Sequence, residues 1–441
     1  MQKKTIPAQL VFIFFLLSCF LCCTPSSKEI QLKKDLTQRY NAQQTYFALI
    51  SDLDAKEQAI VSYVENLSLE EKLSQLFLVN LEGNAKFNPV EYNKLGEPLI
   101  PGGYLFFSYN VADTPEKVRN FTDSIGKFCI EHSKIPPLLC VDQEGGVVNR
   151  LKFITTMLPS CELVSSRMDV KAAENLYYAQ ALQMAALGFH MNLAPVAEAA
   201  VDTNREFLGT RSFGDKEAVK KYATAAVKGF ETGGILSVLK HFPGNTNDDP
   251  HTGLPEITLS AEELEVQYLE PFMHLLKSNP SAVLMSHART TAFDAKNPAC
   301  LSPYWVTEIL RNRYGYPGIV ISDDIFMAAL EKNGFPAETA TIMAIEAGID
   351  IIMLSEKKFG SALQVLLKKA REESDFEKRI TQSVLRIVKA KIKTGILSLV
   401  KNKSAYTVSV TEVDCQDWKS NFDFAKEKGQ NIYNEYFGGM K

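Results

Sequence analysis

Eight short apolar runs recur along the chain, and a longer amphipathic stretch separates each run from the next. A short, wholly apolar run is typical of a buried strand in a parallel sheet, and the longer stretches have room for a crossover helix. Eight such units in succession predict an α/β fold, a (β/α)8 TIM-type barrel. The competing interpretation is a doubly wound sheet, but no GxGxxG sequence follows an early strand of this chain to support it. The runs are LSQLFLVN (73–80), GGYLFF (102–107), PPLLCVD (136–142), FHMNLAPV (189–196), SVLKHF (237–242), AVLMSH (282–287), GIVISDD (318–324) and GIDIIMLS (348–355).

The chain on either side of these runs has a different composition. Residues 1–23 contain Lys3 and Lys4 and then an uncharged apolar run from about residue 8. Residues 24–68 are polar and helix-prone, and we expect a helical spacer there. The barrel is expected over residues 69–400, with two closing helices after residue 356, because apolar residues recur there at spacings of three and four. Residues 401–441 are expected to form a short C-terminal tail.

The apolar start has the layout of a secretory signal and is too short for an assured membrane span. It resembles a bacterial lipoprotein signal, in which an acylated cysteine becomes the mature N-terminus. Cys23 is the favoured attachment site, and Cys19 is the alternative. An ordinary cleaved signal is the competing interpretation. We therefore expect an exported, membrane-anchored lipoprotein on the periplasmic face or the cell surface.

Charge and cysteine content exclude several classes of protein. Lys+Arg 48 against Asp+Glu 52 gives a net charge of −4, with no long run of like charge, so nucleic acid is not an expected partner. Outside the start, the cysteines show no CxxC pair and predict neither a disulfide framework nor a zinc site. Five cysteines lie outside the start, and most of these are expected to be core thiols; the five are Cys129, Cys140, Cys161, Cys300 and Cys415.

Polar residues stand at the ends of four of the predicted strands. In a (β/α)8 barrel the active site lies at the C-terminal ends of the strands, so these residues are expected to converge on one rim. A capping aspartate or a core histidine explains any one of them alone, but not four strand ends together. The residues are Asp142, the pair Lys240 and His241, His287, and the pair Asp323 and Asp324.

At these positions the chain resembles family 3 glycoside hydrolases, in particular the single-barrel β-N-acetylglucosaminidases. The motifs that carry the resemblance are DQEGG (142–146), LAPV (193–196), RSFG (211–214), KHFPGN (240–245), DPH (249–251) with GLP (253–255), and ISDDIFM (321–327). KHFPG with a nearby Asp-x-His is the most specific of them.

The resemblance implies a role for each matching residue. Asp323 is expected to be the nucleophile, with Asp324 in a structural role. His251 is expected to be the general acid and then base, oriented by Asp249. The residues expected to bind the sugar are Asp142, Arg211, Lys240, His241 and His287, the last as a residue that lines the pocket.

Two departures from the family pattern bear on these roles. The loop NTNDDPH is two residues shorter than the usual PGHGxxxxDSH form, so Asp248 is an alternative partner for His251. Val147 stands where an arginine is common, and Arg150 is a candidate to compensate for it.

The expected activity is exo-hydrolysis of terminal β-linked N-acetylglucosamine with retention of configuration, by way of a glycosyl-aspartate. No metal or redox cofactor is implied, since protein groups supply both proton and nucleophile. The expected partner is a GlcNAc-containing oligosaccharide or glycan, as in peptidoglycan turnover. Alternatives within the family are a β-N-acetylglucosamine phosphorylase and a β-glucosidase. The alternative from another class is a surface lipoprotein that binds sugar without turnover.

Overall fold

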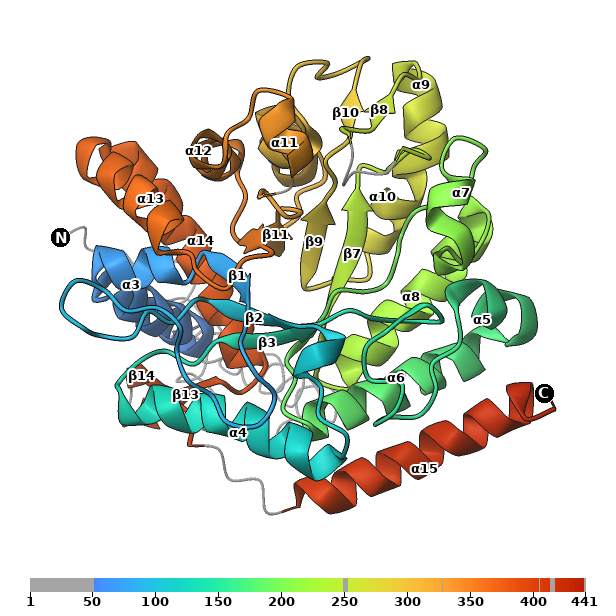
Figure 1. Cartoon of the computed structure of the whole chain (residues 1–441), viewed down its shortest axis with the longest axis horizontal. Helices are drawn as coiled ribbons and strands as arrows, with labels where there is room; N and C mark the ends of the chain where they lie inside the picture. The colour runs from blue at the N-terminus through green and yellow to red at the C-terminus, as the bar shows by residue number, and fades with distance from the viewer. Residues whose placement is uncertain (1–50, 249–252, 327, 404, 413–416, 440–441) are drawn as a thin grey trace, which may run out of the picture. The chain divides into compact units, whose positions relative to one another are not determined.

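The structure is a computed structural model that describes residues 51–248, 253–326, 328–403, 405–412 and 417–439 (Figure 1). Residues 59–441 form one compact unit. The start of the chain, with both candidate acylation sites, lies outside the described residues. So do the loop residues Asp249 and His251, and Cys415.

Eight parallel strands close into a barrel, as the apolar runs predict. They follow one another around the sheet in chain order, and a parallel bridge between Ile321 and Ile351 joins the last two. The first strand also pairs with the last one. The strands are β1 (Phe77–Asn80), β2 (Gly103–Phe106), β3 (Leu138–Val141), β6 (Met191–Asn192), β7 (Leu236–Phe242), β9 (Ala282–Met285), β11 (Ile319–Ile321) and β12 (Ile352–Leu354).

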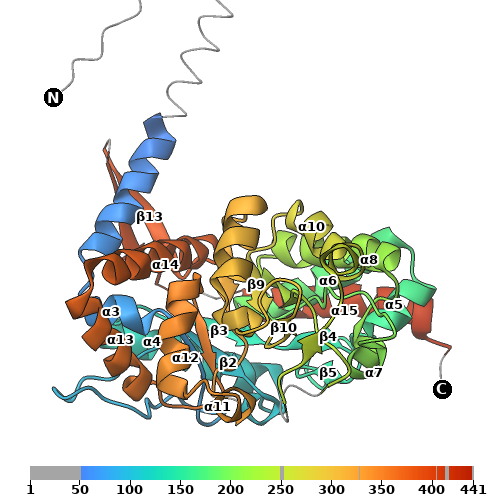
Figure 2. The same cartoon turned by 90° about the horizontal axis from the view of Figure 1, so that it is seen from above.

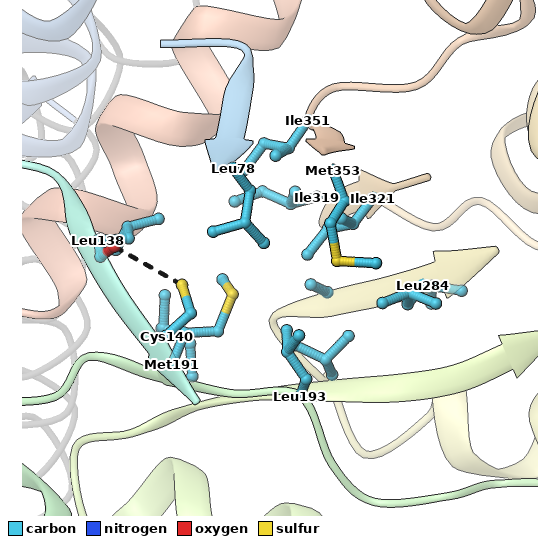
Figure 3. Close-up of a cluster of buried hydrophobic side chains, with 14 of the residues drawn as sticks. Leu78, Leu138, Cys140, Met191, Leu193, Leu284, Ile319, Ile321, Ile351 and Met353 are labelled. Carbon is cyan, nitrogen blue, oxygen red and sulfur yellow. Dashed lines mark hydrogen bonds between the residues drawn. The ribbon is translucent and has the colours of Figure 1, made fainter. Parts of the chain in front are cut away.

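The barrel strands are buried on both faces, because helices cover the outside and side chains fill the inside. All four residues of β1, β2, β3 and β9 are buried. Figure 3 shows side chains from β1, β3, β6, β9, β11 and β12 converging at the centre, among them Leu78, Cys140 and Leu284. The interior is therefore a packed core, and polar chemistry is confined to the rim.

The helices around the barrel begin at the caps that the sequence supplies. Ser68 forms a capping box with Glu71 at the start of α3. Thr114, Asp169 and Asp215 accept a hydrogen bond from a first-turn amide of α4, α6 and α8. The α-helices are α3 (Leu69–Ser74), α4 (Pro115–Glu131), α5 (Cys161–Arg167), α6 (Val170–Ala186), α7 (Arg205–Leu208), α8 (Lys216–Thr232), α9 (Ala261–Leu264), α10 (Glu270–Leu276), α11 (Ala328–Lys332), α12 (Ala337–Ala347), α13 (Gly360–Glu372), α14 (Ser374–Lys393) and α15 (Trp418–Phe437).

Several boundaries differ from those expected from the apolar runs. The run 73–80 begins in the last turn of α3, and of 189–196 only Met191–Asn192 is a strand. Apolar residues alone do not distinguish a strand from the buried end of a helix. The two helices expected after residue 356 are α13 and α14, and of the expected spacer the structure describes a helix over residues 51–65.

The C-terminal segment is folded and packed against the barrel. β13 (Leu397–Asn402) and β14 (Ala405–Val410) form an antiparallel hairpin, so the expected boundary at residue 400 falls inside a strand. Helix α15 lies along α6 in both views (Figures 1 and 2) and buries Phe422, Ala425 and Phe437. Among the helices of the described residues, none combines the length and the hydropathy that a membrane crossing requires.

Candidate active site

The barrel brings the predicted polar residues to one rim. Lys240 and His241 lie at the end of β7, His287 lies two residues beyond β9, and Asp323 lies two residues beyond β11. β7, β9 and β11 are neighbours in the sheet. The C-terminal ends of parallel neighbours meet at one edge, so these residues share one face of the barrel.

A cluster of two cations and two carboxylates forms one part of this rim. Lys240 Nζ lies 2.7 Å from Asp142 Oδ1 and 2.6 Å from Glu144 Oε1. Arg211 binds Glu144 in a bidentate manner, through Nε at 2.8 Å and a terminal nitrogen at 2.9 Å. The side chains of Asp142 and Arg211 are 17% and 18% exposed, against 1% for Glu144. Asp142 and Arg211 are therefore the members of the cluster that are accessible at the rim.

The cluster is strongly polarised. Burial opposes the charge of Glu144, but the charges of Lys240 and Arg211 and their hydrogen bonds outweigh it and lower the pKa of Glu144 to about 2. Burial likewise opposes the charges of Lys240 and Arg211, yet the neighbouring carboxylates raise the pKa of each. All three groups stay charged at neutral pH, and hydrogen bonds made by charged groups are stronger than those between neutral groups.

The hairpin that carries Glu144 explains the QEGG sequence. β4 (Gln143–Gly145) pairs with β5 (Val148–Asn149), and a left-handed turn joins them, with φ of 103° at Gly145 and 56° at Gly146. A Cβ atom on Gly145 would lie 2.1 Å from the carbonyl oxygen of Pro159. Glycine is therefore required here both by conformation and by space.

A second buried carboxylate orients His241. Glu198 Oε1 lies 2.7 Å from Nδ1 of His241, and Oε2 accepts the backbone amide of Asn245 at 2.7 Å. A carboxylate only accepts hydrogen bonds when ionised, so Nδ1 carries the hydrogen and Nε2 is left for another partner. Glu198 therefore fixes both the ring and the following PGN turn.

Asp323 and Asp324 have different surroundings although they are adjacent. The carboxylate of Asp324 accepts the amides of Phe326 at 3.1 Å and Ser355 at 3.0 Å, which fastens the turn after β11. Asp323 accepts the amide of Asp324 at 2.9 Å and is partly exposed. This arrangement agrees with the structural role expected for Asp324 and leaves Asp323 as the carboxylate available to a substrate.

His287 lies deeper than a sugar-binding role requires. Its side chain is fully buried, with Nδ1 3.2 Å from Cys300 Sγ and Nε2 3.0 Å from the carbonyl oxygen of Asp324. Both ring nitrogens thus contact protein atoms. Direct substrate binding by His287 stays a prediction that this geometry does not favour.

The loop after β7 is described up to residue 248. Asp248 makes a local turn, in which its Oδ2 accepts the hydroxyl of Thr246 at 3.0 Å and its amide donates back at 3.2 Å. Pairing of His251 with Asp249, or with Asp248 instead, lies beyond the described part of the loop. The side chain of Val147 is 77% exposed at the hairpin tip, and the guanidinium of Arg150 lies 5.8 Å from the ring centre of Phe107.

The sequence predictions missed two functional residues, Glu144 and Glu198. Both are buried carboxylates that hold a predicted ligand-binding residue, and both follow a strand end by two or more positions. A charged residue inside an otherwise buried motif was the available signal, since an unpaired charge is rarely buried. In the described residues, no group of three or more His, Cys, Asp or Glu side chains is arranged to hold a metal ion.

Fold and rim together define a (β/α)8 barrel with a cluster of charged side chains at the C-terminal ends of its strands. Comparison with known proteins gives the family. Residues 68–390 match the glycosyl hydrolase family 3 N terminal domain, and the chain belongs to this family.

Individual relatives agree with this assignment. The chain is 33% identical over 287 residues to a β-hexosaminidase of Alkalilimnicola ehrlichii, covering 63% of this chain and 79% of the relative. It is 28% identical to β-hexosaminidase A of Pseudoalteromonas piscicida over 69% of this chain, which spans 55% of that longer protein. A solved family 3 β-N-acetylglucosaminidase from Paenibacillus sp. is 28% identical, with a TM-score of 0.69 over 84% of this chain and 69% of that one.

Proposed function

We propose that the chain is a retaining exo-β-N-acetylglucosaminidase that releases terminal GlcNAc from the non-reducing end of a glycan. The observation that carries the proposal is the rim itself. A partly exposed Asp323 follows β11, and Lys240, which pairs with Asp142, lies on β7, two strands further along the sheet. The family membership and the names of the relatives support this choice of substrate.

The proposed first step is displacement at the anomeric carbon. A carboxylate oxygen of Asp323 bonds to this carbon while the glycosidic C–O bond breaks, and His251 protonates the departing oxygen. In the second step His251 accepts a proton from water, the water oxygen bonds to the anomeric carbon, and the bond to Asp323 breaks. Two inversions leave the sugar with its original configuration.

Each group suits its proposed task. Asp323 lies two residues beyond a barrel strand. A displacement of about 1 Å can cost about a hundredfold in rate, so this rigid support suits a nucleophile. Histidine has an ordinary pKa of about 6.5, so it both gives and accepts a proton near neutral pH, and a neighbouring Asp249 would fix its tautomer. The short turn that holds Asp248 to Thr246 lies at the base of this loop.

Sugar recognition is assigned to the charged cluster and to His241. Asp142 and Arg211 reach the surface of the cluster, and Glu198 leaves Nε2 of His241 free of that carboxylate. A substrate lacking the matching hydroxyl leaves such buried polar groups unpaired, which discriminates strongly between sugars.

The test compares aryl β-GlcNAc with aryl β-glucoside as substrates of the full chain and of the Asp323→Asn variant. We expect a preference for the GlcNAc substrate and a loss of at least about a thousandfold in kcat for Asp323→Asn. Asp375→Asn, at an exposed carboxylate on α14, is the matched control and should retain activity. Equal activity of the unsubstituted chain and Asp323→Asn would contradict the assignment of the nucleophile. Adding phosphate and assaying for sugar 1-phosphate distinguishes hydrolysis from phosphorolysis.

We further propose that the enzyme is an exported lipoprotein acting on GlcNAc-containing glycan outside the inner membrane, such as peptidoglycan. Support comes from the sequence: two lysines, an uncharged apolar run and a cysteine followed by TPSSKE. Labelling of expressing bacteria with an alkyne fatty acid should mark the chain, and Cys23→Ala should abolish the label while Cys19→Ala retains it. The reverse pattern assigns Cys19, and an unlabelled parent chain contradicts acylation.

A further inference from the structure

A buried thiol and imidazole pair stands behind the turn that carries Asp323. His287 and Cys300 are both fully buried, and the two Sγ and Nδ1 atoms lie 3.2 Å apart. The other ring nitrogen, Nε2, lies 3.0 Å from the backbone carbonyl of Asp324. The pair therefore contacts the turn that carries Asp323, through the backbone carbonyl of Asp324.

The chemistry of these groups fixes the direction of both hydrogen bonds. A carbonyl oxygen only accepts, so Nε2 of His287 carries a hydrogen and donates it to Asp324. Burial, together with the negative charge of Asp323, raises the pKa of the Cys300 thiol well above its ordinary value, so the thiol keeps its hydrogen. The S–H group therefore donates to Nδ1 of His287, and Nε2 of the same ring donates to the carbonyl oxygen of Asp324.

Asp324 connects this chain of bonds to Asp323. Its backbone amide donates to Oδ1 of Asp323 at 2.9 Å, while its carboxylate binds the amide of Ser355 at 3.0 Å. The residue is thus held at its carbonyl by His287, at its side chain by the strand β12 region, and presents its amide to Asp323. The peptide after Asp324 is also held by the amide of Ile325, which donates to the carbonyl of Met353 at 3.2 Å, so loss of the His287 contact removes one of its two hydrogen bonds.

We propose that Cys300 and His287 are positioning residues that fix the carboxylate of Asp323 for attack on the anomeric carbon. The proposal rests on the proposed function, because it takes Asp323 to be the nucleophile. In this proposal His287 does not contact the sugar, but acts on Asp323 through the backbone of Asp324. A group that acts in this way changes the rate of the chemical step and leaves the affinity for the sugar unchanged.

The test follows formation of the glycosyl-enzyme with a slow probe, 5-fluoro-β-N-acetylglucosaminyl fluoride, in the full chain. A carboxylate oxygen of Asp323 bonds to the anomeric carbon, the C–F bond breaks, and fluoride leaves with the electron pair. Intact-mass spectrometry gives the rate of adduct formation, and peptide mapping gives its site. The variants are Cys300→Ala, which removes the donor to Nδ1, Cys300→Ser, which retains a donor, and His287→Phe, which removes both bonds.

We expect Cys300→Ala to lower the maximal rate of adduct formation about tenfold and His287→Phe about a hundredfold, with half-saturating probe concentration unchanged. Cys300→Ser should restore most of the rate lost in Cys300→Ala. Unchanged rates in Cys300→Ala and His287→Phe, or a change confined to half-saturation, would overturn the positioning role. Absence of an adduct on Asp323 in the unsubstituted chain contradicts the proposed function itself, and the positioning role with it.

A second measurement needs no variant that must fold. Nitrogen-15 labelling of the six histidines reports the tautomer of each ring in the unsubstituted chain. The geometry predicts hydrogen on Nε2 and none on Nδ1 for His287. Hydrogen on Nδ1 alone would contradict the direction of both bonds.

Discussion

Lys240 Nζ lies 2.6 Å from Oε1 of Glu144, a carboxylate within the DQEGG motif to which the sequence predictions gave no role. Arg211 binds both oxygens of the same carboxylate, so one buried anion holds two cations at the rim. The charge of Glu144 thus determines where both cations stand.

Glu144→Gln is expected to lower kcat/KM by about 10- to 100-fold, because the neutral amide replaces charge-assisted bonds worth about 1.5–3 kcal/mol. The assay is hydrolysis of aryl β-GlcNAc by the purified variant. The exposed Glu162→Gln on α5 serves as a control and should retain activity. A Glu144→Gln variant with unchanged kcat/KM would show that the cations need no shared anion.

The pH dependence of stability should report the same carboxylate. Glu144 has a folded-state pKa of about 2, against 4.5 in the unfolded chain, so its contribution is complete above about pH 4.5 and is lost as pH falls toward 2. At about 1.4 kcal/mol for each pH unit, the contribution is about 3 kcal/mol. Urea unfolding between pH 2.5 and pH 6 should show a shallower decline for Glu144→Gln than for the parent. Parallel curves would be inconsistent with this linkage.

The burial of Lys391 predicts that the free energy of unfolding increases as the pH rises above about 7. Its ammonium group is fully buried on α14 and donates to Gln75 Oε1 at 2.6 Å and to the carbonyl of Pro136 at 2.7 Å. Burial lowers the pKa of Lys391 from 10.5 to about 7. Between these values the unfolded chain binds more protons than the folded one, so the free energy of unfolding rises with pH, by up to about 5 kcal/mol.

Lys391→Met should abolish this rise, whereas the exposed Lys368→Met should retain it. The measurement is urea unfolding of the parent and both variants from pH 6.5 to 10. The parent should gain stability relative to Lys391→Met as the pH increases. A constant difference between these two proteins across that range would mean that Lys391 does not titrate there.

Helix α15 should be an integral part of the enzyme. A Cβ atom on Gly429 would lie 2.7 Å from Thr156 Oγ1 and 3.2 Å from Gln183 Nε2, where the helix packs on α6. In an undocked helix, Gly429→Ala stabilises by about 0.5–1 kcal/mol, whereas in the packed helix we expect a loss of about 1–3 kcal/mol. Thermal unfolding of Gly429→Ala beside Gln430→Ala, a change on the exposed side, measures the sign. Stabilisation by Gly429→Ala would contradict docking.

Sequence patterning predicted the barrel because each apolar run reflects burial on both faces, and it predicted the rim because strand ends meet there. It did not predict the docking of α15. The large apolar residues of α15 indicate that one face is buried, but nothing in their spacing identifies α6 as the element that covers it. These residues are Trp418, Phe422, Ile432, Tyr433, Tyr436 and Phe437. For the barrel strands and for α15 alike, the local sequence pattern indicates that a residue is buried, but it does not identify the element that buries it.

Sequence patterns also could not predict which side chains of the site contact one another across distant segments of the chain. Glu144 meets Arg211 and Lys240 only after three strands and their helices have folded, and His287 meets Asp324 across neighbouring strands. The position of His287 beyond its strand predicted a pocket residue, whereas its contacts are with Cys300 and the nucleophile turn. Residue type and spacing indicate where polar groups gather, but not which of them touch.

The anomer released first tests the central claim most directly. Proton NMR of aryl β-GlcNAc hydrolysis, followed from the first minutes before mutarotation, distinguishes the two configurations. The proposed double displacement at Asp323 predicts that β-GlcNAc is released first. Initial release of α-GlcNAc would contradict a glycosyl-aspartate intermediate and the roles assigned to this rim.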